Sequence, residues 1–291
     1  MKPRIGIIPG DPGGIGPELI AKLLADPDVH ETADILLIGD RHLFEMGQTQ
    51  AGTETEMVAC DANKGDWTDI SGLAIHERET IAADDVRLAE VTYANGHSAL
   101  SNLNCALEMA RDGIIDAITF GPFNKAALIE AGLGHEDELH HMAEFLGVEG
   151  YISELNTLNG IWTSRVSSHI ALKDVASYIT EHRITEAVHL IDRTLRRSGL
   201  SRPRLSVAAL NPHAGDNGNF GMEEIEVINP TVETLQAKQM NVDGPWPSDT
   251  VFLKAKAGEV DGIITMYHDQ GQIALKLMGC LLYTSDAADD P

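Results

Sequence analysis

The chain has 291 residues, of which 43% are hydrophobic, so it is long enough to form one large or two modest domains. With 21 Lys and Arg against 45 Asp and Glu, its formal net charge of −24 leaves no basic surface for nucleic acid or anionic lipid. Three cysteines without CxxC or metal-finger spacing, and no apolar run near the roughly 18 residues that cross a bilayer, favour a cytoplasmic protein.

Strands and helices are predicted to alternate along the chain. Short runs rich in apolar and β-branched residues predict strands at residues 4–9, 34–39, 116–120, 160–168, 204–210 and 262–267. Helical period follows residue 17 and recurs at 100–110 and 184–195. Strands that are joined by helices need crossover connections, which predicts an α/β fold with a largely parallel sheet and helices on both faces.

A glycine-rich segment, "GDPGGIGPE", follows the first predicted strand and opens a helix. That position is typical of a phosphate-binding turn, but the spacing does not fit the GxGxxG fingerprint of dinucleotide-binding folds. A tight turn that brings Asp11 and Glu18 towards a site is an equally good interpretation.

Loops that follow the strands are the expected place for a ligand site, because open α/β sheets bind ligands beyond the carboxyl ends of their strands. Three of these loops carry a histidine, namely His169, His213 in "NPHAGD" and His268 in "HDQG". Together they could surround a divalent cation. The alternative is chance, because a chain with 12 histidines will place some of them at strand ends. Lys125 and Lys276 could meet an anionic substrate, or could be helix-surface lysines.

Four segments together resemble one known family. "GDPGGIGPE", "LNPHAGDNGNFGMEE", "GPWPSDTVF" and "YHDQGQIALKLMG" are similar to the 4-hydroxythreonine-4-phosphate dehydrogenase family of pyridoxine (vitamin B6) biosynthesis. The resemblance runs from about residue 4 to residue 279. It implies a two-lobed, isocitrate/isopropylmalate dehydrogenase-like fold and a homodimer with a shared active site. It also implies that His169, His213 and His268 bind the metal and that Lys276 contacts the substrate.

The activity implied by this resemblance is the oxidation, with decarboxylation, of a 4-phosphorylated four-carbon hydroxy acid. The expected substrates are 4-hydroxythreonine 4-phosphate or 4-phospho-threonate or -erythronate. The expected cofactors are NAD, with NADP as the alternative, and a divalent metal: Zn²⁺, or else Mg²⁺, Mn²⁺ or Co²⁺. Lys276, Asp249 and Asp269 are the candidate catalytic residues. The alternatives are a metal-dependent lyase or hydrolase on the same scaffold, or a non-catalytic metal- and ligand-binding protein.

One departure from the family concerns the substrate. Where relatives carry a histidine and a threonine that contact the substrate, this chain reads Glu138 and Leu139. These two residues and Lys125 are the candidate substrate contacts. Because a carboxylate repels phosphate, Glu138 favours a relative with a different substrate, unless His135 or His140 compensates after a loop shift.

Two lobes are predicted. The first comprises residues 1–130 together with 262–279, and the second, residues 131–261, carries much of the metal site and of the dimer contacts. Residues 280–291, "CLLYTSDAADDP", depart from the family's continuation and are predicted to be a non-native tail. In the family the segment that holds the adenine half of NAD follows this point, so no NAD-binding residue is assigned.

Overall fold

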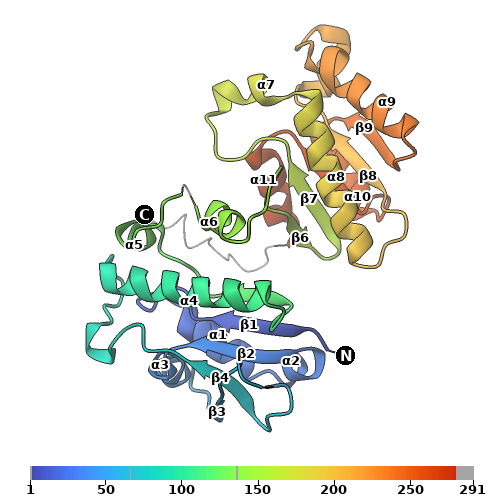
Figure 1. Ribbon diagram of the computed structural model, residues 1–291. Coiled ribbons are helices and arrows are strands. Elements are labelled where there is room, and N and C mark those ends of the chain that lie inside the picture. The colour runs from blue at the N-terminus through green and yellow to red at the C-terminus, as the bar shows by residue number, and fades with distance from the viewer. Residues whose placement is uncertain (1, 66, 136, 280–291) are drawn as a thin grey trace. The chain divides into compact units, whose positions relative to one another are not determined.

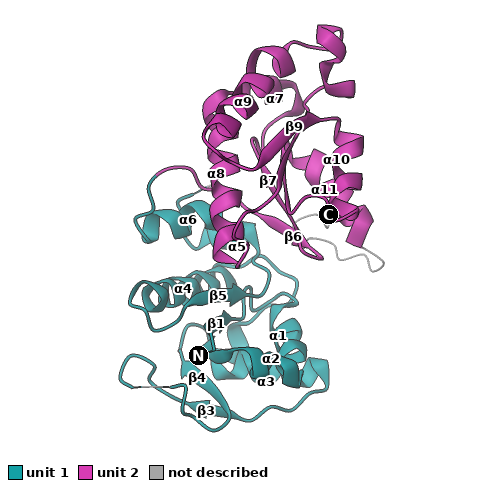
Figure 2. Ribbon diagram, turned by 90° about the vertical axis from the view of Figure 1, so that its right-hand side faces the viewer, with its two compact units in different colours: residues 1–149, 285–291 teal, residues 150–284 magenta. Residues whose placement is uncertain are grey.

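The computed structural model describes residues 2–65, 67–135 and 137–279. Within them the chain divides into two compact units, here called unit 1, up to Glu149, and unit 2, from Gly150 onwards (Figure 2). The predicted tail, residues 280–291, lies outside the described residues.

Unit 1 is built on a five-stranded sheet in which every ladder is parallel, in the order β3-β4-β2-β1-β5. Figure 1 labels the first four of these strands. Its elements are β1 (Arg4–Ile8), α1 (Gly16–Leu24), α2 (Pro27–Thr32), β2 (Asp34–Gly39), α3 (Arg41–Ala51), β3 (Met57–Ala59), β4 (Leu73–Glu77), the 3₁₀ turn η1 (Ala83–Asp85), α4 (Tyr93–Arg111), β5 (Ala117–Phe120), α5 (Lys125–Glu130) and α6 (Glu138–Phe145).

The core of unit 1 follows from the two-residue period of its central strands. Ile7 of β1 packs in one cluster with Ile20 of α1 and Phe44 of α3. Its neighbour Ile8 points to the opposite face and packs with Leu103 and Leu107 of α4. Helices therefore cover both faces, which is why residues 35–38 of β2 are apolar and buried in succession.

Unit 2 is built on a second five-stranded sheet, in the order β6-β7-β10-β8-β9, with only β6 antiparallel to its neighbour. Its elements are β6 (Asn156–Leu158), β7 (Ile161–Arg165), η2 (Leu172–Asp174), α7 (Val175–Tyr178), α8 (Glu181–Arg197), β8 (Leu205–Ala208), the turn segment η3 (Pro212–Gly218), the π-helical segment η4 (Glu224–Ile228), α9 (Asn229–Ala237), β9 (Val242–Trp246), α10 (Ser248–Lys256), β10 (Gly262–Thr265) and α11 (His268–Gly279).

Strand β10 lies in the middle of this sheet and is buried on both faces. Ile264 packs with Val188 and Leu195 of α8, whereas the adjacent Ile263 packs with Val251 of α10 and Leu275 of α11. The helical period predicted at residues 184–195 is confirmed, since the apolar positions of that face of α8 are buried.

The predicted α/β class is confirmed, and all six predicted strands are present. The short strands β3, β4, β6 and β9 were not predicted. The lobes divide at a different place from the prediction, which put residues 262–279 in the first lobe and began the second lobe at residue 131. Because β10 forms hydrogen-bonded ladders with β7 and β8, both it and α11 belong to unit 2. Among the residues described, no helix combines the length and apolar character of a membrane span.

Candidate functional site

The carboxyl edge of the unit 2 sheet collects the three histidines singled out in the sequence. Strands β7, β10 and β8 are neighbours and run parallel, so their carboxyl ends lie along one edge. His169 follows β7, His268 follows β10 and His213 follows β8, each within five residues of the strand end. The strand order therefore puts His268 between the other two, although the three are far apart in the sequence.

Two of the three imidazoles lie next to each other. The ring centroids of His169 and His268 are 5.6 Å apart. Two imidazoles that bind one tetrahedral zinc ion have ring centres about 5 Å apart, given metal–nitrogen distances of about 2.0–2.1 Å. His268 Nδ1 also lies 2.7 Å from Asp269 Oδ1, the kind of carboxylate contact that orients a metal-binding histidine. The ring spacing of this pair is therefore compatible with both imidazoles binding one cation.

His213 occupies a different environment. Its ring packs at 6.2 Å from that of Phe220, and its backbone is left-handed, with φ of 53°. The structure thus brings His169 and His268 together without adding His213 to them. Within residues 2–65, 67–135 and 137–279, no three His, Cys, Asp or Glu side chains are grouped as metal ligands.

The other predicted residues of unit 2 follow strands of the same sheet. Lys276 is exposed on α11, about 12 Å along the helix axis from His268 at 1.5 Å per residue. Asp249 is exposed in the first turn of α10, just beyond β9, and its Oδ1 accepts a hydrogen bond from Thr250 Oγ1 at 3.3 Å. Asp269 contacts His268 and is largely exposed. Ionisable groups therefore follow the ends of both β9 and β10, and one of them, Asp269, contacts a histidine of the pair.

Two buried polar side chains fasten the strand ends behind the histidines, and the sequence analysis assigned neither of them a role. Gln270 Oε1 accepts from the Met266 N–H at 2.7 Å, and its Nε2 donates to the Ala209 carbonyl at 2.7 Å. It thereby ties the end of β10 to the end of β8. The second is Glu224, whose carboxylate accepts hydrogen bonds from the loop that carries His213. The only sequence signal was that both residues occur inside the quoted motifs.

In unit 1 the glycine-rich turn has a packing role. Gly16 lies so close to other backbone that an added Cβ would come 2.1 Å from the Pro9 carbonyl oxygen, and at Gly121 the same distance is 2.3 Å. Asp11 is buried and accepts from the Gly13 N–H at 2.8 Å. Burial raises the pKa of Asp11 and the Gly13 bond partly opposes this. The observed glycines are those required for close backbone packing, as in the tight-turn interpretation. Glu18 forms an ion pair with Lys22 on α1.

The candidate substrate contacts of unit 1 lie at the starts of two helices. Lys125 is the first residue of α5 and is exposed; Glu138 and Leu139 begin α6 and are partly buried. Asp137 caps α6 by accepting from the His140 N–H at 3.0 Å. Burial acts to raise the pKa of Asp137, but hydrogen bonds from His140 and the charges of His140 and Lys125 outweigh it and lower this pKa. The α6 start therefore carries two carboxyl groups, Asp137 and Glu138, with Lys125 close to the first.

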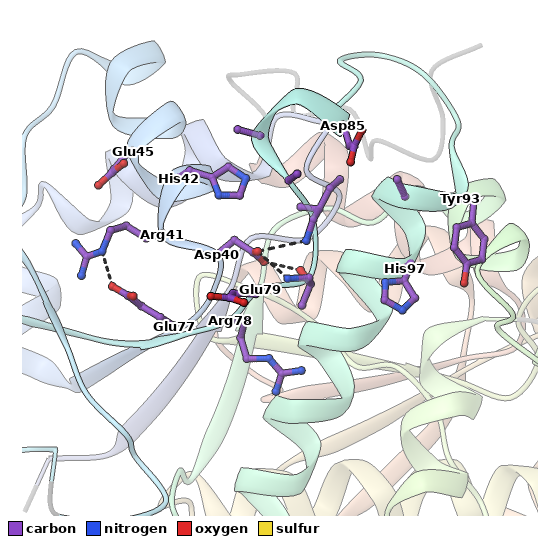
Figure 3. Close-up of a pocket in the computed structure, with 15 residues that line it drawn as sticks. Asp40, Arg41, His42, Glu45, Glu77, Arg78, Glu79, Asp85, Tyr93 and His97 are labelled. Carbon is purple, nitrogen blue, oxygen red and sulfur yellow. Dashed lines mark hydrogen bonds and ion pairs between the residues drawn. The ribbon is translucent and has the colours of Figure 1, made fainter.

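A cavity of about 680 Å³ lies in unit 1 beyond the ends of β2 and β4 (Figure 3). Asp40 is buried beside it and accepts from the N–H groups of Thr80 at 2.7 Å and Ile81 at 3.3 Å. Arg41 and Glu77, which also line the cavity, form an ion pair, and the ring centroids of Tyr93 and His97 lie 5.7 Å apart in a stacked arrangement. The ionised side chains of the lining are the carboxylates of Asp40, Glu45, Glu77, Glu79 and Asp85 and the guanidinium groups of Arg41 and Arg78. This excess of carboxylates disfavours a phosphorylated ligand.

Comparisons with known proteins agree with one another. The family model described as "Pyridoxal phosphate biosynthetic protein PdxA" matches residues 31–281. A Pseudomonas aeruginosa protein, provisionally named 4-hydroxythreonine-4-phosphate dehydrogenase 2, is 48% identical over 95% of this chain and 83% of its own length. A Symbiobacterium thermophilum protein, provisionally named D-threonate 4-phosphate dehydrogenase, is 34% identical over 95% of this chain and 82% of its own.

A solved structure extends this likeness to the fold. The crystal structure of 4-hydroxythreonine-4-phosphate dehydrogenase from Klebsiella pneumoniae superimposes with a TM-score of 0.85 at 32% identity, over 96% of this chain and 84% of that chain. The predicted resemblance is therefore confirmed at the level of both sequence and fold.

Proposed function

Because the chain belongs to the family described as pyridoxal phosphate biosynthetic protein PdxA, whose members include named dehydrogenases, we propose that it oxidises a 4-phosphorylated four-carbon hydroxy acid with NAD. The names of its relatives supply two substrate candidates, 4-hydroxythreonine 4-phosphate and D-threonate 4-phosphate. NADP is the alternative cofactor. The observation that carries the proposal is the neighbour order β7–β10–β8, which gathers three histidines along one sheet edge.

The proposed metal ligands are His169, His213 and His268. Two observations support this set: the 5.6 Å spacing of His169 and His268, and the position of His213 in the loop that follows β8, the neighbour of β10 on the side opposite β7. His213 would have to turn from Phe220 towards this pair to complete the set. Three neutral imidazoles suit Zn²⁺ or Co²⁺ better than Mg²⁺, which prefers oxygen ligands. A divalent cation held there supplies positive charge that favours loss of the proton from the substrate hydroxyl group.

The side chains around the histidines have distinct proposed roles. Asp269 holds Nδ1 of His268, which fixes the orientation of the ring and leaves Nε2 to face the cation. The ammonium group of Lys276 binds an anionic group of the substrate or transfers a proton. Asp249, exposed at the start of α10, is the proposed acid–base group on the β9 side of the edge.

The proposed contacts in unit 1 concern substrate choice. Lys125 offers a positive charge, whereas Glu138 and the neighbouring Asp137 put negative charge at the start of α6. A phosphate close to Glu138 would be repelled. We therefore expect Glu138→His to raise the affinity for a phosphorylated substrate relative to the same acid without phosphate.

The remaining parts of the proposal rest on the family. We propose a cytoplasmic homodimer that shares its active sites between subunits and that acts in pyridoxine biosynthesis or on a related sugar-acid phosphate. If the site is shared, dilution to monomers lowers metal affinity. A monomer in light scattering that binds metal tightly would contradict the shared site.

The decisive experiment is an NADH absorbance assay with phosphorylated and unphosphorylated four-carbon hydroxy acids, with Zn²⁺ or Co²⁺ supplied. His213→Ala is expected to lower kcat/KM by about 10³-fold or more, because several kcal/mol of charge stabilisation are lost at 1.36 kcal/mol per tenfold change. The matched control is His182→Ala, an exposed histidine of α8 in the same unit, which should leave kcat/KM unchanged.

Three outcomes would redirect the proposal. Normal activity and bound metal in His213→Ala would remove His213 from the site. Turnover of a sugar acid without NAD or NADP would point to a lyase or hydrolase. Metal binding without any turnover or nucleotide binding would point to a non-catalytic binding protein.

A further inference from the structure

We propose that Glu224 is a positioning residue that aims His213 by fixing the backbone between β8 and the turn segment η3. The inference rests on the proposed function, because it assigns Glu224 a role in holding one of the proposed metal ligands. Glu224 does not itself touch the substrate or the metal in this proposal. It acts through the loop that carries His213.

The carboxylate of Glu224 is buried, with 1% of the residue exposed. Its Oε1 accepts from the backbone N–H groups of Leu210 at 2.9 Å and Asn211 at 2.7 Å. Its Oε2 accepts from Nδ2 of Asn211 at 2.9 Å. These three donors are uncharged, and a buried carboxylate is costly unless hydrogen bonds replace its water. One side chain thus holds two successive backbone groups and one amide of the same short loop.

The loop that it holds has an unusual backbone. Residues 213–217 all have positive φ, between 44° and 80°, and only Gly215 among them is a glycine. L-residues avoid this conformation, so a run of this kind persists only where the surrounding structure fixes it. Gly215 lies directly against the Glu224 carboxylate, since an added Cβ there would come 2.8 Å from Glu224 Oε2. The carboxylate therefore supports the loop at its start and beneath its middle.

A second buried contact ties the start of the same loop to the end of β10. Gln270 joins the Met266 N–H beyond β10 to the Ala209 carbonyl beyond β8, so the two strand ends cannot drift apart. Gln270 sets the base from which both histidine loops start. Glu224 then determines the path from Leu210 to His213, and its removal should affect His213 without moving His268.

The substitution Glu224→Gln tests this assignment with little change in shape. The amide keeps one oxygen acceptor, but its NH₂ group then faces the NH₂ group of Asn211, where two donors repel. We expect Co²⁺ affinity, measured by titration with visible absorption of the bound ion, to fall by about 10- to 100-fold, the usual effect of losing a residue that orients a metal ligand. The matched control is Glu226→Gln, an exposed carboxylate of the same segment η4, which should leave the affinity unchanged.

A double substitution separates positioning from general loosening of the fold. If Glu224 acts through His213, Glu224→Gln causes no further loss of Co²⁺ affinity in a His213→Ala background. An additive loss in the double variant, or unchanged affinity in folded Glu224→Gln, would overturn the proposal. If Glu224→Gln does not fold, Asn211→Ala removes the side-chain amide that donates to Glu224 and Glu223 but keeps the backbone N–H groups of Leu210 and Asn211, and it should still weaken Co²⁺ binding; unchanged affinity there would also overturn the proposal. Failure of the proposed function is distinguishable in the unsubstituted chain: without a metal site it would bind no Co²⁺, and without the dehydrogenase activity it would bind Co²⁺ but not turn over.

Discussion

In unit 2 the loops that leave β7, β10 and β8 present imidazole and carboxylate side chains, whereas in unit 1 the loops that leave β1 and β5 pack backbone against backbone. His268 and Asp269 keep substantial exposure, at 37% and 72% of their side chains. Gly16 and Gly121, by contrast, leave no room for any side chain beside the Pro9 carbonyl. Both edges are carboxyl ends of parallel strands, yet the edge of unit 2 carries exposed ionisable side chains and these loops of unit 1 carry closely packed glycines.

The difference shows that the carboxyl ends of parallel strands do not form a functional site unless the loops that follow them carry accessible reactive side chains. The buried carboxylates of unit 1 are satisfied locally, Asp11 by Gly13 and Asp40 by Thr80 and Ile81. In unit 2 the buried groups Glu224 and Gln270 lie behind the loops, which leaves the ionisable groups in front of them accessible. Metal chemistry is therefore expected at the edge of unit 2, whereas substitutions at the glycines packed around Pro9 in unit 1 should chiefly change stability.

The largest effect is expected from substituting His169. His169→Asn should lower kcat/KM by about 10³-fold with an unchanged free energy of unfolding, because it removes half of the close histidine pair. His97→Asn, in the cavity wall of unit 1, is the matched control and should retain nearly full activity. Equal losses of activity in His169→Asn and His97→Asn would contradict the expectation that the chemistry takes place in unit 2.

A stability effect is expected from the glycine turn of unit 1. Gly16→Ala should cost about 3 kcal/mol of unfolding free energy, since its Cβ would overlap the Pro9 carbonyl oxygen and the backbone would have to shift. Urea unfolding followed by circular dichroism measures this loss. Gly134→Ala, where an added Cβ meets nothing within 4 Å, should be nearly neutral. Equal unfolding free energies of the two variants would show that the close packing of this turn does not contribute to the stability of the fold.

A smaller loss is expected from the buried guanidinium group at the end of β7. Arg165 is 4% exposed and pairs with Glu154, so Glu154→Gln leaves a buried charge without its partner and should cost about 2 kcal/mol. The same experiment on Asp116→Asn, which breaks the exposed pair with Arg4 in unit 1, should give a clearly smaller change. A larger loss in Asp116→Asn would contradict the role of burial.

The smallest effect is a pH dependence that belongs to unit 1. Burial, and next the charge of His135, lower the pKa of His141, against the opposing charge of Glu144. The unfolded chain therefore takes up this proton first as the pH falls, and stability is lost below the usual histidine pKa of about 6.5.

His141→Gln keeps a donor for Asn104 Oδ1, which His141 Nε2 contacts at 2.7 Å. It should reduce the loss of urea midpoint between pH 7 and pH 5.5. His182→Gln on exposed α8 is the control, and an equally steep pH dependence in His141→Gln would exclude His141 as a source of the acid sensitivity.

Much of the fold could be predicted because its signals are local. The strand at residues 34–39 was predicted with the bounds that the structure gives β2, and the buried face of α8 follows directly from its 3.6-residue period. The short strands β3 and β6 were missed because three residues carry too little pattern. The assignment of β10 to a lobe also failed, since pairing with β7 and β8 is a contact between distant parts of the chain.

The sequence by itself determined the α/β class, the positions of the histidines after strands and the family motifs that surround them. Only the tertiary structure decided that β10 lies between β7 and β8, that His169 and His268 come within 5.6 Å, and that Glu224 and Gln270 hold the loops behind them. The physical reason is that residue type and period act over a few positions, whereas strand order and buried hydrogen bonds join residues that are tens of positions apart. A histidine after a strand can be read in the sequence; the neighbour that it meets depends on which strands pair.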